Sequence, residues 1–577
     1  MNQLLTHWKN RAAVTDKLLG MMHTTRKFGW VVGLVFMAIS LYPKLTHDLS
    51  SDAMFYLYMA QRMLDGAQYY YDFFEYNTPF AIGIYIIPVA IARMLGVFIP
   101  TVAIWFVACL LVASIAFVHS IIIRSPEWQR MVNYNALIIA LFISLNFLST
   151  YYFNISTTKS IIFLCFILPY FFSIHLLVSQ EELAHWQHVS IGILLGLCMC
   201  LKPHYALFAM VMEIYAAIKL RRALFGFRLS NILAALVVIL YYGVIMPLYF
   251  DGYLKIIPLF FQYYEAAYYT VWHKLAEVLL YAAYSFPFVI WYLLLRKQLR
   301  SVGQYEIFFA GMLASIMVLT TESLLSLDQL SLYNFFISVP FIYTLLLFSR
   351  HSQAFLPSMG LTRKMIATTC VVIACVSIFG LVKLVRAFDP TPRAEEVVTS
   401  KMVEFVKQYA PEDYVYTISD STQHYAPVML YLSPRHYPIF HLQGMLKQME
   451  YNYEKYEGQP LPPKEKEAEK YFMDSFHKDF IEGSPKLVFV SREDLKHNME
   501  YCLPSLLEIL LKRNPEFRSK WQQYKKVGTV LEINEQKILD GSRERAKLIR
   551  YDNKEQEIMF TPSNVRVAWL DVYLRED

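Results

Sequence analysis

The chain has 577 residues, of which 56% are hydrophobic and 16% aromatic, and its mean hydropathy is +0.34. This balance excludes an ordinary soluble protein and indicates a polytopic membrane protein. The formal net charge of +6 is modest and spread along the chain, so nucleic acid is not an expected partner.

About eleven apolar runs are long enough to cross a membrane as helices. They cover residues 28–46, 101–123, 134–150, 158–179, 187–201, 204–220, 229–250, 275–295, 305–324, 332–349 and 365–386. The first run follows a polar, basic lead and therefore predicts a retained anchor rather than a cleaved signal peptide. A further run, 79–98, is interrupted by Pro88 and Arg93.

The positive-inside rule decides whether 79–98 crosses the membrane. If it does not cross, the basic loops fall on the same side as the basic N-terminus; these are 124–130, 219–228, 296–300 and 350–364. We therefore expect 79–98 to be a re-entrant or juxtamembrane helix. The prediction is an integral protein of the plasma membrane (the inner membrane of a bacterium), with a cytoplasmic N-terminus and a periplasmic or extracellular C-terminal domain.

From about Asp389 the chain becomes rich in charged residues, after a linker marked by Pro390 and Pro392. Short β-type runs and amphipathic helical runs alternate there, which is typical of an α/β domain. The predicted strands are 414–418, 487–490 and 567–574, and the predicted helices are 395–409, 463–482 and 503–513. We therefore expect an α-helical transmembrane domain at 1–388, with an acidic first outer loop at 47–100, and a soluble α/β domain at 389–577.

The first outer loop carries most of the functional signal. Asp52, Tyr56, Ala60 and Met63 fall at helical spacing, and Gly66 is a suitable C-terminal stop. Asp52 would then lie in the first turn of an interfacial helix. A carboxylate there is stabilised by the helix dipole, so capping is an alternative to chemistry, and Asp48 has the same two interpretations.

Four segments, in order, resemble GT-C glycosyltransferases, in particular protein O-mannosyltransferases and the aminoarabinose transferases of lipid A. Residues 52–66 resemble the first-loop motif of that family, although Ala53 stands where many relatives have Glu. The stretch 71–79 resembles the aromatic and acidic segment that ends in prolines. The stretch 192–203 resembles a small-residue helix that closes on a lysine, and 333–340 resembles the aromatic start of a late span.

The resemblance implies a membrane glycosyltransferase that uses a sugar on a polyprenyl phosphate. The acceptor would be a hydroxyl of a glycan, lipid or protein at the outer face, and membrane lipids would surround the spans. Asp52 would act as the general base of a single, inverting displacement. The sequence does not specify the sugar.

Cations on the expected outer face are candidates to assist the leaving phosphate: Lys202, His204, His273, Lys274 and Arg62. Lys202 could equally snorkel to the interface, and headgroup contact is the stronger interpretation of His273 and Lys274. A second set of residues is predicted to bind the acceptor or a divalent cation: Asp48, Tyr56, Asp72 and Glu75. A solvated loop is an equally plausible interpretation of this set. No cofactor is otherwise indicated.

Two other classes compete with the enzyme. A transporter or flippase of a lipid-linked glycan would need charged residues along a path through the bundle, whereas these carboxylates cluster in predicted outer segments. A scaffold would use its outer domain to bind a partner. Glu213 is the exception within a span, where an ionisable group is often functional but can also bond to a neighbouring helix.

Overall fold

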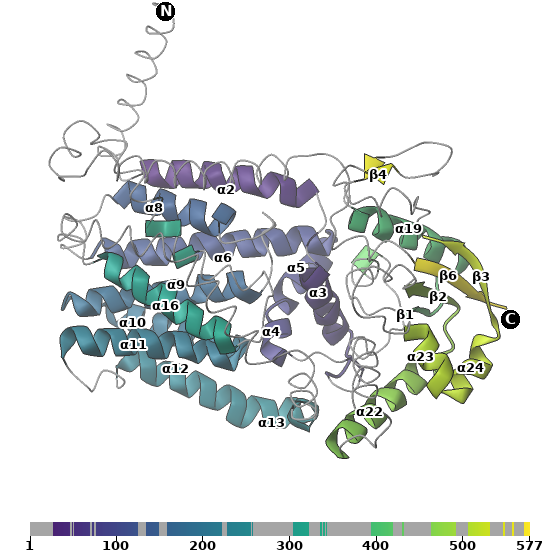
Figure 1. The fold of residues 1–577 in the computed structure, drawn as a ribbon. Helices are drawn as coiled ribbons and strands as arrows, with labels where there is room; N and C mark the ends of the chain where they lie inside the picture. The colour runs from purple at the N-terminus through teal and green to yellow at the C-terminus, as the bar shows by residue number, and fades with distance from the viewer. Residues whose placement is uncertain are drawn as a thin grey trace, which may run out of the picture. The chain divides into compact units, whose positions relative to one another are not determined.

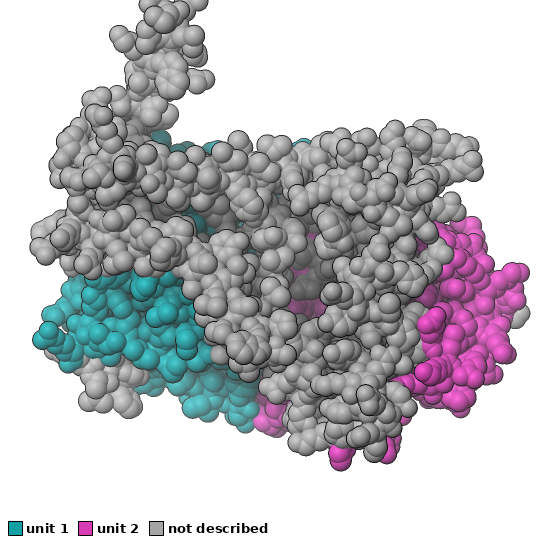
Figure 2. Space-filling model, viewed as in Figure 1, with its two compact units in different colours: residues 1–46, 104–244, 269–388 teal, residues 47–103, 245–268, 389–577 magenta. Residues whose placement is uncertain are grey.

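The computed structural model describes eleven longer stretches of the chain and several short pieces. The stretches are 27–46, 51–69, 77–124, 134–148, 159–221, 228–255, 304–321, 394–418, 463–491, 506–530 and 570–576. The chain is mostly helical (Figure 1). It divides into two compact units, drawn in two colours in Figure 2.

Unit 1 consists of residues 1–46, 104–244 and 269–388, and its described part is made of apolar helices. These are α2 (Phe28–Thr46), α6 (Ile99–Ile122, from Ile104 onward), α8 (Tyr134–Ile143), α9 (Lys159–Val178), α10 (His185–Leu201), α11 (Ala206–Leu220), α12 (Leu229–Leu240) and α16 (Gln304–Thr321). Each lies where the sequence predicts an apolar run. Helices α10 and α12 pack side by side (Figure 1), and α11 packs on α16.

Three helical segments among the described residues are long and apolar enough to cross a membrane: Ile99–Ile122, Ile161–Val178 and Leu229–Tyr249. Shorter apolar helices accompany them, so the chain is a helical membrane protein. The predicted runs 275–295 and 365–386, and most of 332–349, lie outside the described residues. The total of about eleven spans therefore stays a prediction.

Helices α10 and α12 approach each other closely because α10 carries two glycines on the contact face. A Cβ added at Gly192 would lie 2.6 Å from the carbonyl oxygen of Ser230, and one added at Gly196 would lie 2.6 Å from Val237. Small residues allow such backbone contact between membrane helices. The small-residue stretch of the sequence thus has a packing role.

Unit 2 consists of residues 47–103, 245–268 and 389–577. Its first part holds α3 (Ser51–Leu64), α4 (Pro79–Gly83) and α5 (Ile86–Leu95), and its second part holds α13 (Met246–Tyr249). The two units group segments differently from the expected boundary at residue 389, which stays a prediction. Unit 2 joins the first predicted outer loop to the tail.

The tail contains a four-stranded sheet in the order β1-β2-β6-β3. The strands are β1 (Val415–Ile418), β2 (Leu487–Ser491), β3 (Tyr524–Thr529) and β6 (Leu570–Arg575). Strand β1 is parallel to β2, whereas β6 is antiparallel to both β2 and β3. The two short strands β4 (Ala546–Lys547) and β5 (Glu557–Ile558) form a separate antiparallel pair.

Helices accompany this sheet: α19 (Ala394–Tyr409), α22 (Pro463–Phe476), the π-helical turn η5 (His477–Glu482), α23 (Leu506–Arg513) and α24 (Pro515–Trp521). An aromatic cluster joins them to the strands. Phe480 of η5 lies 5.4 Å from Tyr416 of β1 and 4.8 Å from Phe517 of α24, measured between ring centroids. All three side chains are buried, so they form the core of this part.

Candidate functional site

Helix α3 carries the first candidate, Asp52, as its second residue. The expected helix is present, and Gly66 follows its end with a φ of +90°, a conformation that favours glycine. Every side chain from Ala53 to Ala60 is buried. A single apolar stripe cannot explain eight consecutive buried residues, so protein covers α3 on all sides along this stretch. The side chain of Asp52 itself is outside the described part.

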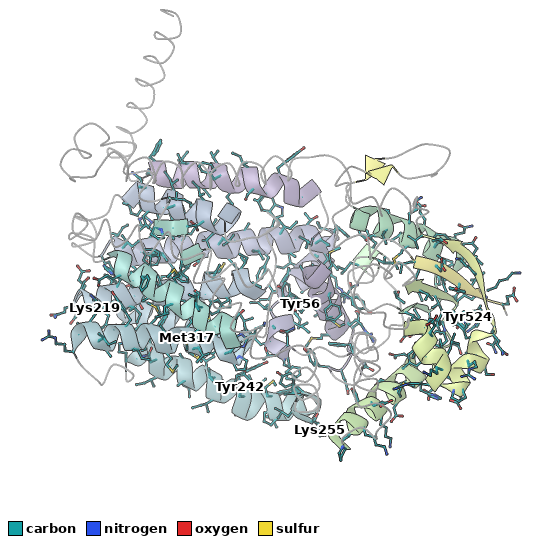
Figure 3. The ribbon with its side chains drawn as sticks, in the orientation of Figure 1. Tyr56, Lys219, Tyr242, Lys255, Met317 and Tyr524 are labelled. Atoms are coloured by element: carbon teal, nitrogen blue, oxygen red, sulfur yellow. The ribbon has the colours of Figure 1, made fainter. Side chains whose placement is uncertain are left out.

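Tyr56 connects α3 to the next segment of the loop. Its hydroxyl accepts a hydrogen bond from Asn77 Nδ2 at 3.2 Å, and its ring stacks on Tyr85 with centroids 5.5 Å apart. Figure 3 labels Tyr56. The hydroxyl of Tyr69 donates to the Asn77 carbonyl oxygen at 3.0 Å. Pro79 then begins α4, where its missing N–H costs no hydrogen bond. Asn77 thus fixes how the loop returns to α3.

The remaining loop candidates differ in exposure. Asp72 is half-buried, and its carboxylate accepts a hydrogen bond from the backbone N–H of Gln68 at 2.8 Å. The guanidinium carbon of Arg62 lies 6.0 Å from the ring centroid of Phe73, within cation–π range. Arg93 forms a two-pronged ion pair with Asp65, which accounts for a charge in the apolar run 79–98.

Lys202 and His204 lie in unit 1, at a break between two helices. Lys202 has extended backbone (φ −153°, ψ 125°) between α10 and the 3-10 turn η2 (Pro203–Tyr205). The residue before a proline is forced out of the helical region, so Pro203 causes the break. Both side chains are half-buried, and the His204 ring packs on Tyr205 with centroids 5.0 Å apart. The two residues share one turn.

Four predicted site residues lie outside the described residues: Asp48, Glu75, His273 and Lys274. Within the described stretches, no three His, Cys, Asp or Glu side chains are grouped as a metal site would require. The divalent cation therefore stays a prediction, as do the roles assigned to Asp52, Tyr56, Asp72, Lys202, His204 and Arg62.

Glu213 bonds to neighbouring helices, which is the structural interpretation of this residue. The Tyr170 hydroxyl of α9 donates to Glu213 Oε1 at 2.7 Å, and Arg228, at the start of α12, pairs with the same oxygen. The side chains of Arg228 and Glu213 are only 13% and 19% exposed. Helices α9, α11 and α12 thus meet at one carboxylate that is largely withdrawn from solvent.

Sequence reasoning assigned no role to three of these residues. Arg228 counted only as a basic loop charge, Tyr170 as one aromatic among many, and Asn77 as part of a motif. Periodicity can place each residue on an element, but it carries no information about the distant partner. An asparagine before a helix-starting proline was the one local signal available for Asn77.

The helices of the described residues form a fold that is similar to that of a solved membrane protein of the kind the four segments resemble. It is similar to that of ArnT from Cupriavidus metallidurans in the apo state, with a TM-score of 0.50 and 12% identity over 82% of this chain and 94% of that chain. At this identity the likeness concerns the fold alone. Neither a protein-family model nor a curated protein matches the sequence.

Two further solved structures are similar at lower scores, and the fold comparison does not depend on them. ArnT bound to undecaprenyl phosphate gives a TM-score of 0.49 and 11% identity, over 81% of this chain and 94% of that chain. The oligosaccharyltransferase AglB from Archaeoglobus fulgidus, in complex with an inhibitory peptide and a dolichol-phosphate, gives 0.39 and 12%, over 87% of this chain and 73% of that chain.

Proposed function

We propose that the chain is a membrane glycosyltransferase that moves a sugar from a polyprenyl phosphate to an acceptor hydroxyl. The observation that carries the proposal is the position of Asp52. It is the second residue of helix α3, which follows the apolar helix α2 in a chain with an ArnT-like fold. The first-loop motif that resembles GT-C glycosyltransferases has its acidic residue at this position.

The reaction is a single displacement at the anomeric carbon. The acceptor oxygen forms a bond to that carbon while the bond from the carbon to the phosphate oxygen breaks. The carboxylate of Asp52 takes the acceptor proton, because a neutral hydroxyl is a poor nucleophile. Polyprenyl phosphate leaves with the bonding electrons, and the anomeric configuration inverts.

Negative charge develops on the phosphate as it leaves, so donors of positive charge at the interface would lower the barrier. Lys202 and His204, which share the turn between α10 and α11, are proposed to meet this need. His273, Lys274 and Arg62 complete the proposed set. Asp48, Tyr56, Asp72 and Glu75 are proposed to bind the acceptor or a divalent cation.

The site is proposed to face the periplasm or the cell exterior, across a bacterial inner membrane with about eleven spans. The positive-inside rule supports this orientation. The composition of unit 2 also supports it, because that unit gathers residues 47–103 and 389–577, two segments that the rule assigns to the outer face. The tail would then be an outer α/β domain beside the acceptor.

Replacing Lys202 by alanine tests the phosphate contact. We expect the rate of transfer from a polyprenyl-phosphate sugar to fall about 10- to 100-fold, because a hydrogen bond to a charged group contributes about 1.5–3 kcal/mol. Lys255→Ala is the matched control, since Lys255 forms an exposed pair with Asp251 in a segment assigned to the same face. Equal rates in both variants would exclude Lys202 from the phosphate site.

A further inference from the structure

We propose that Tyr242 positions Lys202, because its hydroxyl supplies the hydrogen bond that Pro203 removes from the end of helix α10. This role deepens the proposed function and rests on it, since Lys202 is proposed to contact the phosphate of the donor. Tyr242 acts through the helix end and not on the substrate, so it is a positioning residue rather than a catalytic one.

One backbone carbonyl at the end of α10 has lost its usual helical partner. In an α-helix the carbonyl of residue i accepts from the N–H of residue i+4, and four residues after Met199 the chain has Pro203, which has no N–H. The hydroxyl of Tyr242 donates to the Met199 carbonyl oxygen instead, at 3.3 Å. A side chain of the neighbouring helical run therefore caps the last turn of α10, directly ahead of Lys202.

Close packing brings Tyr242 to the backbone of α10. Gly196 faces Val237 of α12 so closely that an added Cβ would lie 2.6 Å from the valine. Tyr242 follows in the π-helical turn η4 (Tyr241–Ile245) that continues α12, and Figure 3 labels it. The ring of Tyr241, which is 6% exposed, contacts that of Tyr242 edge-on with centroids 4.9 Å apart. The hydroxyl is thus held at the helix end by a kind of turn that is frequent at functional sites.

The cap matters to Lys202 because that residue is the first one outside α10. Its backbone is extended and leads into the turn η2, so the last turn of α10 fixes where the residue begins. The last carbonyls of a helix need partners, and helix ends fray without them. An ammonium group stabilises the leaving phosphate only while it is held beside the phosphate oxygen. Loss of the Tyr242 hydroxyl would therefore weaken the phosphate contact and leave the binding of the lipid tail unchanged.

The test replaces Tyr242 by phenylalanine in the full-length protein in detergent and measures the binding of two probes. One probe is a polyprenyl phosphate, and the other is the uncharged polyprenol of the same length. We expect the Kd of the phosphate to rise about 3- to 10-fold, the size of one neutral hydrogen bond. The Kd of the polyprenol should stay unchanged, because it has no phosphate for Lys202 to contact. A general loss of packing would weaken the binding of both probes alike.

Tyr249→Phe is the matched control, because Tyr249 lies further along the same helical run and is 75% exposed; it should change neither Kd. Adding Tyr242→Phe to Lys202→Ala should raise the Kd of the phosphate no further, as expected for two coupled residues. An unchanged Kd in Tyr242→Phe, equal losses for both probes, or additive effects in the double variant would overturn this role. Phosphate binding without sugar transfer by the wild-type protein would overturn the proposed function alone, and wild-type protein that binds no phosphate would overturn both.

Discussion

Asparagine in place of Asp52 is expected to lower the rate of sugar transfer by about 10²- to 10⁴-fold, the range that general base catalysis contributes. The amide has nearly the same size as the carboxylate but cannot accept the acceptor proton. Helix α3 should still form, because its apolar residues from Ala53 to Ala60 stay buried. The measurement is the single-turnover rate with a polyprenyl-phosphate sugar, together with a thermal melt to confirm folding.

Two controls separate chemistry from electrostatics in this experiment. Asp65→Asn removes a carboxylate just after the same helix, where it pairs with Arg93 at the surface, and should keep the wild-type rate. Asp48→Asn removes the other candidate near the start of α3. A full rate in Asp52→Asn with a lost rate in Asp48→Asn would move the base from one residue to the other.

Methionine in place of Arg228 is expected to destabilise the protein by about 3–5 kcal/mol, the usual cost of breaking a buried ion pair by removing one partner. Glu213 would keep only the hydrogen bond from Tyr170. Since α9, α11 and α12 meet at this carboxylate, the loss should loosen all three contacts. The measurement is the midpoint of thermal unfolding in detergent.

The size of this effect depends on burial, which gives the experiment its control. Lys219 pairs with Glu306, but these side chains are 38% and 37% exposed, and exposed pairs contribute about 0–1 kcal/mol. Lys219→Met should therefore shift the midpoint little (Figure 3 labels Lys219). Adding Glu213→Gln to Arg228→Met should recover part of the loss. Equal shifts in the Lys219 and Arg228 single variants would contradict a buried pair.

The break inside the run 79–98 shows what local sequence can predict. Pro88 marked the run as interrupted, and the structure divides it into α4 and α5, which end and begin on either side of Ile84 and Tyr85. A proline ring clashes with the carbonyl four residues earlier in a helix, and that residue is Ile84. The interruption was predictable, but its location four residues before Pro88 required the clash to be considered.

The candidate site was predictable only in part. Helical spacing and Gly66 sufficed for α3, because both are local properties of the chain. The bond from Asn77 to Tyr56 spans 21 residues, and the stack of Phe98 on Tyr431 joins residues far apart in sequence. Such partners are selected by packing of the whole unit, which periodicity does not encode. The charged composition of the tail therefore predicted a separate domain, whereas the structure groups the tail with the first loop in unit 2.

The most direct test of the central claim follows the bond between sugar and phosphate. Purified protein in vesicles would receive a polyprenyl-phosphate sugar and candidate acceptors, and free polyprenyl phosphate and glycosylated product would be measured together. The proposed function predicts equal amounts of both, with the anomeric configuration inverted and neither formed by Asp52→Asn. Movement of the intact lipid-linked sugar across the bilayer, with no release of polyprenyl phosphate, would contradict it and identify a flippase.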